Sequence, residues 1–286
     1  MTPDADEVEA VAVDQPVVAA EAPGAAGDGL ARQRYKLTIA YDGTQFHGWQ
    51  KQTPPPPAKP LRTVAGVVED RLQHALQQPI TLVGASRTDT GVHARGQVAH
   101  FDAATRIPLD RMALAINARL PHDIEVRHVE AVAPGFDAIR DARCKQYRYR
   151  IFNSPRRPLE KRTHVWHCWL DLDVAAMHAA AQHLVGEHDF ASLAAAGHKR
   201  LTTVRTIFAC SVTPDPEHEE IHITVQGNGF LYNMVRILAG TLIEVGRRRW
   251  PPDHVPAILA ARDRAAAGPT LPPTGLWLEW VRYEAE

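Results

Sequence analysis

The fold is decided first by a strand-like stretch at residues 35–41, which reads Tyr35-Lys36-Leu37-Thr38-Ile39-Ala40-Tyr41. Its side chains alternate as in a half-buried strand, and Asp42-Gly43 then signals a turn. Working outward, we expect a helix at 64–76, strands at 80–83 and 96–101, a helix at 109–120 and a strand at 124–132. The order β-α-β-β-α-β over residues 34–132 predicts one ferredoxin-like unit.

The second half of the chain follows the same order. We expect strands at 146–152, 204–212, 221–225 and 275–283, and helices at 173–185, 230–245 and 255–261. The sequence therefore predicts an α+β protein with two ferredoxin-like halves, residues 32–137 and 138–286. Their antiparallel sheets are expected to face a central cleft, a usual place for a binding site.

Residues 1–31 form an acidic N-terminal extension with seven Asp or Glu residues and no Lys, Arg or aromatic residue. We expect this extension to be disordered, because it cannot bury enough apolar area to offset its ordering entropy. The other residues carry 32 basic and 26 acidic side chains, so the net charge of −1 hides a positive body. Such a body suits an anionic partner, although an ordinary solvated surface has the same charge pattern.

Composition also limits function and location. The longest apolar stretch, residues 229–243, is too short to span a bilayer and contains an arginine. The three cysteines, Cys144, Cys168 and Cys210, are too few and too scattered for a disulfide framework or a Cys-rich zinc site. We find no pattern of a secretory signal, so a reducing cytoplasm is the expected location.

The densest polar stretch is the loop at residues 84–98, Gly84-Ala85-Ser86-Arg87-Thr88-Asp89-Thr90-Gly91-Val92-His93-Ala94-Arg95-Gly96-Gln97-Val98. It is hard to explain as a simple turn, because charged side chains gather there beside flexible glycines. On the residues alone two interpretations stay open. Asp89 acts in chemistry, or it accepts backbone N–H bonds and pairs with an arginine.

This loop resembles the signature Gly-Arg-Thr-Asp-x-Gly-Val-His-Ala of the tRNA pseudouridine synthase A (TruA) family. Six further segments resemble that family's motifs in the same order: Phe46-His47-Gly48-Trp49-Gln50, Asn117-Ala118-Arg119-Leu120-Pro121, Tyr147-Arg148-Tyr149, Gly186-Glu187-His188-Asp189-Phe190, Asn228-Gly229-Phe230-Leu231-Tyr232-Asn233-Met234-Val235-Arg236 and Gly275-Leu276-Trp277-Leu278. The resemblance covers about residues 35 to 283. Ser86 stands where the family usually has glycine, and Ile139 where an arginine is common.

The resemblance implies a fold, an activity and a partner. The protein would isomerise uridine to pseudouridine at positions 38, 39 and 40 in the anticodon arm of tRNA. It would work as a homodimer, without a cofactor or metal, and bind RNA in the cleft. A carboxylate suits this reaction, because it can attack the ribose or stabilise positive charge on it while the C1′–N1 bond breaks. By resemblance that carboxylate is Asp89.

Three further site residues are expected. Arg236 is the only charged residue in the apolar stretch 229–243, so it either snorkels to water or pairs with an acid. By resemblance it is the counter-ion of Asp89. Tyr147 would stack on the target base and is a candidate for moving the C5 proton, although a core tyrosine is the alternative. Arg87 would help to hold the extruded nucleotide, unless it pairs with Asp89 itself.

Basic runs could also follow the RNA backbone: Arg156, Arg157, Lys161 and Arg162; His198, Lys199 and Arg200; and Arg247, Arg248 and Arg249. Each run alone is equally typical of a solvated surface. Three other functions were weighed. A non-catalytic RNA-binding ferredoxin-like module would carry an aromatic RNP1 strand, which we do not find. A zinc enzyme could use His164, His167 and Cys168, and a cysteine hydrolase would need a recognisable nucleophile setting.

Overall fold

The structure is a computed structural model that describes residues 30–52, 60–195 and 201–284. Three expectations lie outside these ranges and are not described by it: the disorder of the acidic extension up to residue 29, the stiff, extended loop that the four consecutive prolines Pro54 to Pro57 predict, and the basic run His198, Lys199 and Arg200.

The first half of the chain has the expected order of elements: β1 (Gln33–Tyr41), α1 (Val64–Leu76), β2 (Val83–Gly84), β3 (His93–Ala103), α2 (Leu109–Asn117) and β4 (Ile124–Val132). The bounds predicted for α1 and β4 are confirmed. Helix α1 begins after Thr63, whose side chain accepts a hydrogen bond from the Gly66 N–H, and ends at Gln77 in a left-handed conformation. The strands lie in the order β4-β1-β3, and β2 pairs with β3.

The second half contains all the other elements: β5 (Cys144–Asn153), β6 (Trp166–Cys168), α3 (Val174–Gln182), β7 (Gly186–Asp189), β8 (Val204–Asp215), β9 (Glu220–Gly227), α4 (Met234–Gly246), α5 (Val255–Ala261) and β10 (Leu276–Arg282). Its strands lie in the order β10-β5-β9-β8-β7. We number β5, β8, β9 and β10 as the first to fourth strands of this unit. The order β10-β5-β9-β8 then places the fourth, first, third and second strands side by side. The first half has the same order, which supports two ferredoxin-like units; the division at residue 137 stays a prediction.

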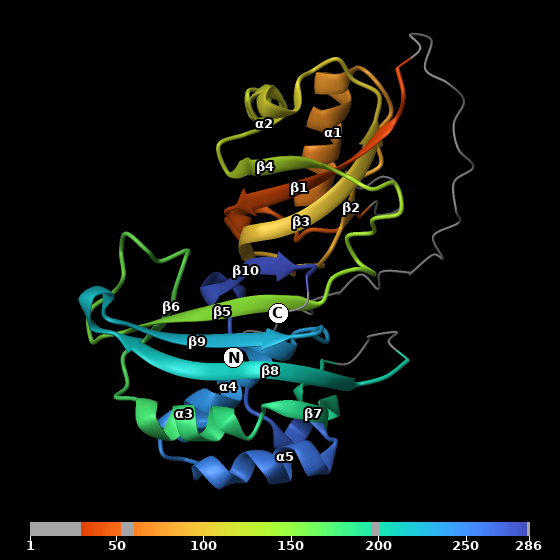
Figure 1. Ribbon diagram of the computed structural model, residues 1–286. Helices are drawn as coiled ribbons and strands as arrows, with labels where there is room; N and C mark the ends of the chain where they lie inside the picture. The colour runs from red at the N-terminus through yellow and green to blue at the C-terminus, as the bar shows by residue number, and fades with distance from the viewer. Residues whose placement is uncertain (1–29, 53–59, 196–200, 285–286) are drawn as a thin grey trace.

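One continuous sheet runs through both halves, so the antiparallel sheets expected for the two halves are joined edge to edge. Strand β10 lies between the halves in Figure 1 and pairs with β3 in parallel, Trp277 opposite His93 and Leu278 opposite Ala94. Strand β2 covers the same edge of β3 only at His100 and Ala99. The other end of that edge would expose unpaired backbone groups, and β10 covers it. The α+β class itself is confirmed.

Other differences are local. Helix α2 ends at Asn117 instead of residue 120, because the Asn117 side chain hydrogen-bonds both backbone groups of Val126 in β4, each at 2.8 Å. Helix α4 begins at Met234, four residues later than expected, after Asn233 in a left-handed conformation. Strand β2 has two residues where four were expected, and the short strands β6 and β7 were missed.

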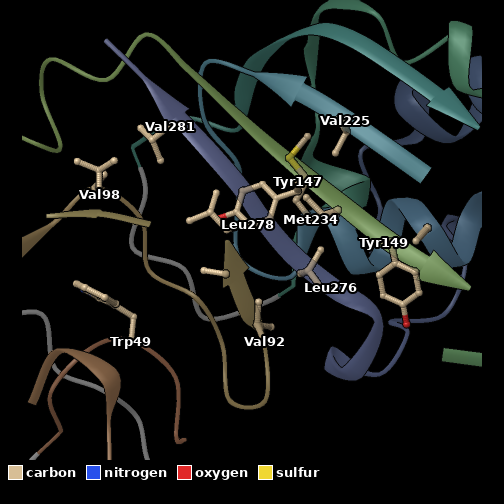
Figure 2. Packing of buried hydrophobic residues seen from close by; sticks show 14 of the residues in the cluster. Trp49, Val92, Val98, Tyr147, Tyr149, Val225, Met234, Leu276, Leu278 and Val281 are labelled. Carbon is tan, nitrogen blue, oxygen red and sulfur yellow. The ribbon is translucent and has the colours of Figure 1, made fainter. Parts of the chain in front are cut away.

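A single hydrophobic core extends across the seam between the halves. Figure 2 shows Trp49 and Val92 from the first half facing Tyr147, Leu278 and Met234 from the second, and all five side chains are buried. In Figure 1, α1 and α2 belong to the upper half, and α3, α4 and α5 to the lower one. None of the helices in the described ranges has the length and apolar character to cross a membrane. Shared core and shared sheet together fix the loop before β3 against the second half.

Candidate active site

The loop between β2 and β3 is held in place where it leaves β2. Gln97 Oε1 accepts a hydrogen bond from the Ser86 N–H at 3.2 Å, and Gln97 Nε2 donates one to the Ser86 carbonyl at 2.6 Å. The side chain thus pairs with both backbone groups of Ser86, as a neighbouring strand would. Gln97 is fully buried, so these bonds are protected from water. Ser86 stands where the family usually has glycine, and the two hydrogen bonds from Gln97 still hold its backbone in place.

The middle of the loop packs against the segment after β1. Tyr41 and Thr88 share a hydrogen bond of 2.7 Å between their hydroxyls, and the Trp49 N–H donates to the Thr88 carbonyl at 3.0 Å. Gly48 has a φ of +78°, and a Cβ on it would lie 2.5 Å from the Thr88 oxygen. The segment Phe46 to Gln50 therefore fits this loop closely, which gives a physical reason for its presence beside the loop motif.

Asp89 begins a tight turn that returns the chain to β3. The Val92 N–H donates to the Asp89 carbonyl at 3.1 Å, and Gly91 has a φ of +77°. A positive φ at the third position is the mark of a type II turn, which favours glycine there. The Gly91 N–H also donates to the Phe46 carbonyl at 3.2 Å. The turn thus fixes the backbone of Asp89 while its side chain remains 27% exposed.

Arg236, from the first turn of α4, lies beside Asp89. The two side chains approach to 3.5 Å between Arg236 Nη1 and Asp89 Oδ2. Two other groups orient the guanidinium: Arg236 Nε donates to the Leu271 carbonyl at 2.6 Å and Nη1 donates to Asn233 Oδ1 at 2.8 Å. Arg236 is therefore held mainly by the second half and presents one edge to the aspartate of the first.

The electrostatics of Asp89 follow from this arrangement. Burial raises the pKa of its carboxyl above the ordinary value, and the charge and hydrogen bonding of Arg236 pull it back down. Within the described ranges, Arg236 is the one basic side chain that forms an ion pair with Asp89. Arg236 thus favours the charged form of the Asp89 carboxylate.

Tyr147 lies on the second-half side of the same place. It is 7% exposed, and its ring meets that of Phe230 edge-on at 5.1 Å between centroids. Burial raises the pKa of its phenol, the charge of Asp89 raises it further, and an interaction with the Ser86 side chain lowers it. Because burial dominates, the hydroxyl is neutral at physiological pH. Loop and tyrosine are therefore neighbours, although they are about 60 residues apart in the chain.

The structure brings three of the four expected site residues together: Asp89, Arg236 and Tyr147. Arg87 differs, because it is exposed on the loop while Asp89 is half-buried. Asn233 and the Leu271 carbonyl were missed. Asn233 had a signal, three residues before Arg236 on the same helix end, whereas a backbone carbonyl leaves no mark in a sequence.

The basic runs divide into two kinds. Arg247 and Arg249 both pair with Glu244, at 3.2 and 2.9 Å, and Arg248 lies 3.6 Å from Asp173. This run neutralises acids of its own surroundings and offers little to an RNA. In the run at residues 156–162, Arg156 pairs with Glu219 and Lys161 with Glu220.

The residues weighed for a zinc site do not converge. His167 Nε2 donates to the Ser154 carbonyl at 2.9 Å, and Cys168 contacts the Leu170 carbonyl, whereas His164 turns to Asp42.

A different group, Asp42, His93 and His164, brings three possible ligand atoms within 4.8 Å of one another. Asp42 accepts from His164 at 2.9 Å and from Thr44, and His93 Nδ1 accepts from the Gly43 N–H at 3.1 Å. These atoms are thus committed to hydrogen bonds, and the bond between Asp42 and His164 joins the halves.

Comparison with known proteins agrees with the geometry. The family model described as tRNA pseudouridine synthase matches residues 37–139 and 180–284. The tRNA pseudouridine synthase A of Moorella thermoacetica is 47% identical over 248 residues, which are 87% of this chain and 98% of that protein. That of Ruminiclostridium cellulolyticum is 44% identical over 251 residues, 88% of this chain and 100% of that protein. The chain therefore belongs to the tRNA pseudouridine synthase A family.

Proposed function

We propose that this protein isomerises uridine to pseudouridine in tRNA and that the Asp89 carboxylate acts on the ribose. The observation that carries the proposal is the ion pair between Asp89 and Arg236, 3.5 Å apart at the seam between the halves. In this pair Asp89 belongs to the loop that bears the family motif, and Arg236 belongs to α4. Membership of an isomerase family favours this function over a non-catalytic RNA-binding module. The reaction needs neither a redox change nor an energy source.

The chemistry follows from one ionised carboxylate. Asp89 either attacks C1′ and displaces the uracil through N1, or stabilises the positive charge that develops on the sugar as that bond breaks. The freed uracil turns, C5 bonds to C1′, C5 loses its proton and N1 gains one, so the product is an isomer of the substrate. Both routes require Asp89 in its charged form, which is the form that Arg236 favours.

Tyr147 and Arg87 would serve the substrate. A target base can reach Asp89 only after it leaves its stack, and the Tyr147 ring offers it an aromatic face. The neutral Tyr147 hydroxyl is also the candidate for moving the C5 proton. Arg87, exposed on the loop, would contact the extruded nucleotide through its phosphate.

The proposal includes a substrate site and an assembly. The uridines would be those at positions 38, 39 and 40 of the anticodon arm, and the enzyme would act as a homodimer in the cytoplasm. The resemblance to the family supports these points. Light scattering on the purified full chain tests the homodimer, because one protomer has a mass of 31.6 kDa.

A direct experiment tests the function. The purified protein is incubated with a tRNA transcript that has uridine at positions 38, 39 and 40, and pseudouridines are mapped. A matched transcript with cytidine at those three positions is the control. New pseudouridine at one or more of the three positions, and none in the control, is the expected result. Pseudouridine only elsewhere would refute the proposed position, and none in any transcript would refute the activity.

A further inference from the structure

The loop between β5 and β6, residues 154–165, contains four Lys and Arg side chains, and two of them have carboxylate partners. Arg156 pairs with Glu219 at 2.9 Å, and Lys161 pairs with the buried Glu220 at 2.9 Å. These pairs tie both ends of the basic run to the β8–β9 turn. They also give Arg156 and Lys161 carboxylate partners within the protein.

The other two basic side chains, Arg157 and Arg162, line a cavity of about 510 Å³. In the described part of the chain, neither has an acidic partner. Arg162 Nη1 donates to the Leu159 carbonyl at 3.1 Å, which leaves the guanidinium's other donors available. Among the described residues, two positive charges therefore border one cavity without an ion-pair partner.

The rest of the lining narrows the class of ligand. Trp166 and Val165 give the cavity an apolar wall, and Thr274 adds a hydroxyl. Its volume is within the usual range for small-molecule sites. Paired guanidinium groups match the oxygens of a phosphate in charge and in geometry, and an apolar wall suits the sugar or base next to it. The combination fits a nucleotide unit better than a free carboxylate.

The cavity lies close to the Asp89 site along one short segment. The Leu271 carbonyl accepts from Arg236, and the Pro272 carbonyl accepts from Tyr149 at 2.8 Å. Pro273 packs on the catalytic turn, where a Cβ on Gly91 would lie 3.0 Å from it. Thr274 is the next residue and lines the cavity. Three residues span at most about 10 Å, so the cavity and the candidate active site are neighbours.

We infer that this cavity binds a backbone phosphate of the tRNA strand that carries the target uridine, with Arg157 and Arg162 as its ligands. The inference deepens the proposed function and rests on it. The site would hold the strand beside the extruded nucleotide, so it contributes to RNA binding and leaves the bond-breaking step to Asp89.

Single substitutions in one loop test this inference. Arg157→Ala and Arg162→Ala each remove a cavity charge, and Arg156→Ala removes a charge that Glu219 already neutralises. Binding of the tRNA transcript and the single-turnover rate at saturating tRNA are measured for each variant. We expect Arg157→Ala and Arg162→Ala to raise the Kd roughly tenfold each, and Arg156→Ala to change it by less than about twofold. The saturated rate should be unchanged in all three.

Two further readouts sharpen the test. Each cavity variant should lower the slope of log Kd against log salt by about 0.7 to 0.9, since one phosphate contact is lost. Leu159→Glu places a carboxylate at the cavity, and because that side chain is 70% exposed the fold should tolerate it. It should weaken tRNA binding at least as much as Arg157→Ala. Melting temperatures of all variants should match that of the unchanged protein.

The outcomes separate the two proposals. Equal effects of Arg156→Ala, Arg157→Ala and Arg162→Ala would overturn the inference, because they would indicate general charge and no built site. Unchanged tRNA binding in Leu159→Glu would overturn it as well, and would leave another ligand, such as an acidic peptide, for the cavity. If the unchanged protein makes no pseudouridine in tRNA, the proposed function fails, and with it the assignment of this phosphate.

Discussion

Each half of the molecule has a carboxylate between the second and third strands of its unit: Asp89 between β2 and β3, and Glu220 at the β8–β9 connection. The two carboxylates differ in burial and in the number of their basic partners. Glu220, at the start of β9, is fully buried and receives Arg150 at 2.8 Å, Lys161 at 2.9 Å and His222 at 3.0 Å. Asp89 is part-exposed and has Arg236 at 3.5 Å.

The pKa values of the two carboxyl groups move in opposite directions. Burial would raise the pKa of Glu220, but its hydrogen bonds and ion pairs hold it well below the ordinary value. At Asp89 burial prevails over the Arg236 counter-ion, and the pKa is raised. The contrast indicates that a saturated carboxylate stabilises a fold, whereas an undersatisfied one is available to react.

The largest expected effect is on the reaction. Asp89→Asn keeps size and removes the charge, so turnover should fall by at least about 1,000-fold, roughly 4 kcal/mol of barrier. Folding stability at pH 7 should not fall, because a group whose folded pKa is raised loses stability as pH rises through that pKa. Single-turnover assays and urea unfolding measure the two effects.

The exposed Asp110→Asn, at the start of α2, is the matched control and should have normal activity. An Asp89→Asn activity within tenfold of the unchanged protein would contradict the role of Asp89.

Glu220→Gln should have the opposite pattern. It leaves Arg150 and Lys161 without their carboxylate, so we expect a loss of about 3 kcal/mol of unfolding free energy. Because the folded pKa of Glu220 is lowered, its contribution is present above the ordinary glutamate pKa and is lost as pH falls through the folded pKa. The stability gap between variant and unchanged protein should therefore shrink as the pH is lowered.

Glu219→Gln, which removes only the exposed Arg156 pair, is the control and should cost less than about 1 kcal/mol. Equal losses in the two variants, or a gap that grows toward low pH, would contradict this account of Glu220.

Arg236→Met tests the Arg236 counter-ion of Asp89. Without it the pKa of Asp89 should rise further, so activity should fall most at low pH, by roughly tenfold for each unit by which the pKa rises. Arg236→Lys restores the charge without the planar fork and should rescue only part of the activity. The pH–rate profile measures both. If the rate falls at the same acidic pH in the unchanged protein and in both variants, Arg236 has only a structural role.

The smallest effects are expected at two tyrosines of β5. The Tyr149 hydroxyl donates to the Pro272 carbonyl, so Tyr149→Phe should cost about 1 kcal/mol of stability. Tyr147→Phe keeps the ring for stacking, so activity should fall less than about tenfold. A loss of more than about tenfold in Tyr147→Phe, measured as the single-turnover rate, would contradict this expectation and would show that the hydroxyl takes part in the reaction beside the ring.

Local signals predicted much of the secondary structure. Apolar residues at helical spacing predicted α1 with correct bounds, and the structure adds that Thr63 and the left-handed Gln77 cap its two ends. The bounds predicted for β2 were wrong, because a strand of two residues is too short to have a detectable alternation of apolar and polar side chains. The single sheet could not be foreseen, because β3 and β10 join residues more than 180 positions apart and pairing partners of that kind leave no local pattern.

The candidate site divides in the same way. Arg236 could be singled out because a lone charge in an apolar helix needs a partner, and Asp89 because its loop is dense in polar groups. The Leu271 carbonyl that orients Arg236 and the Gln97 clamp on Ser86 depend on tertiary contacts. The different fates of Arg156 and Arg157, neighbours in one basic run, also depend on which acid lies nearby.

The contrast between the two carboxylates is tested most directly by titrating them in one protein. Carbon-13 NMR of side-chain-labelled Asp and Glu, with signals assigned through Asp89→Asn and Glu220→Gln, follows both groups against pH. We predict an Asp89 pKa above that of an ordinary aspartate and a Glu220 pKa below that of an ordinary glutamate. An Asp89 pKa below the ordinary aspartate value would show a carboxylate saturated like Glu220, and would contradict the claim that Asp89 is kept available for chemistry.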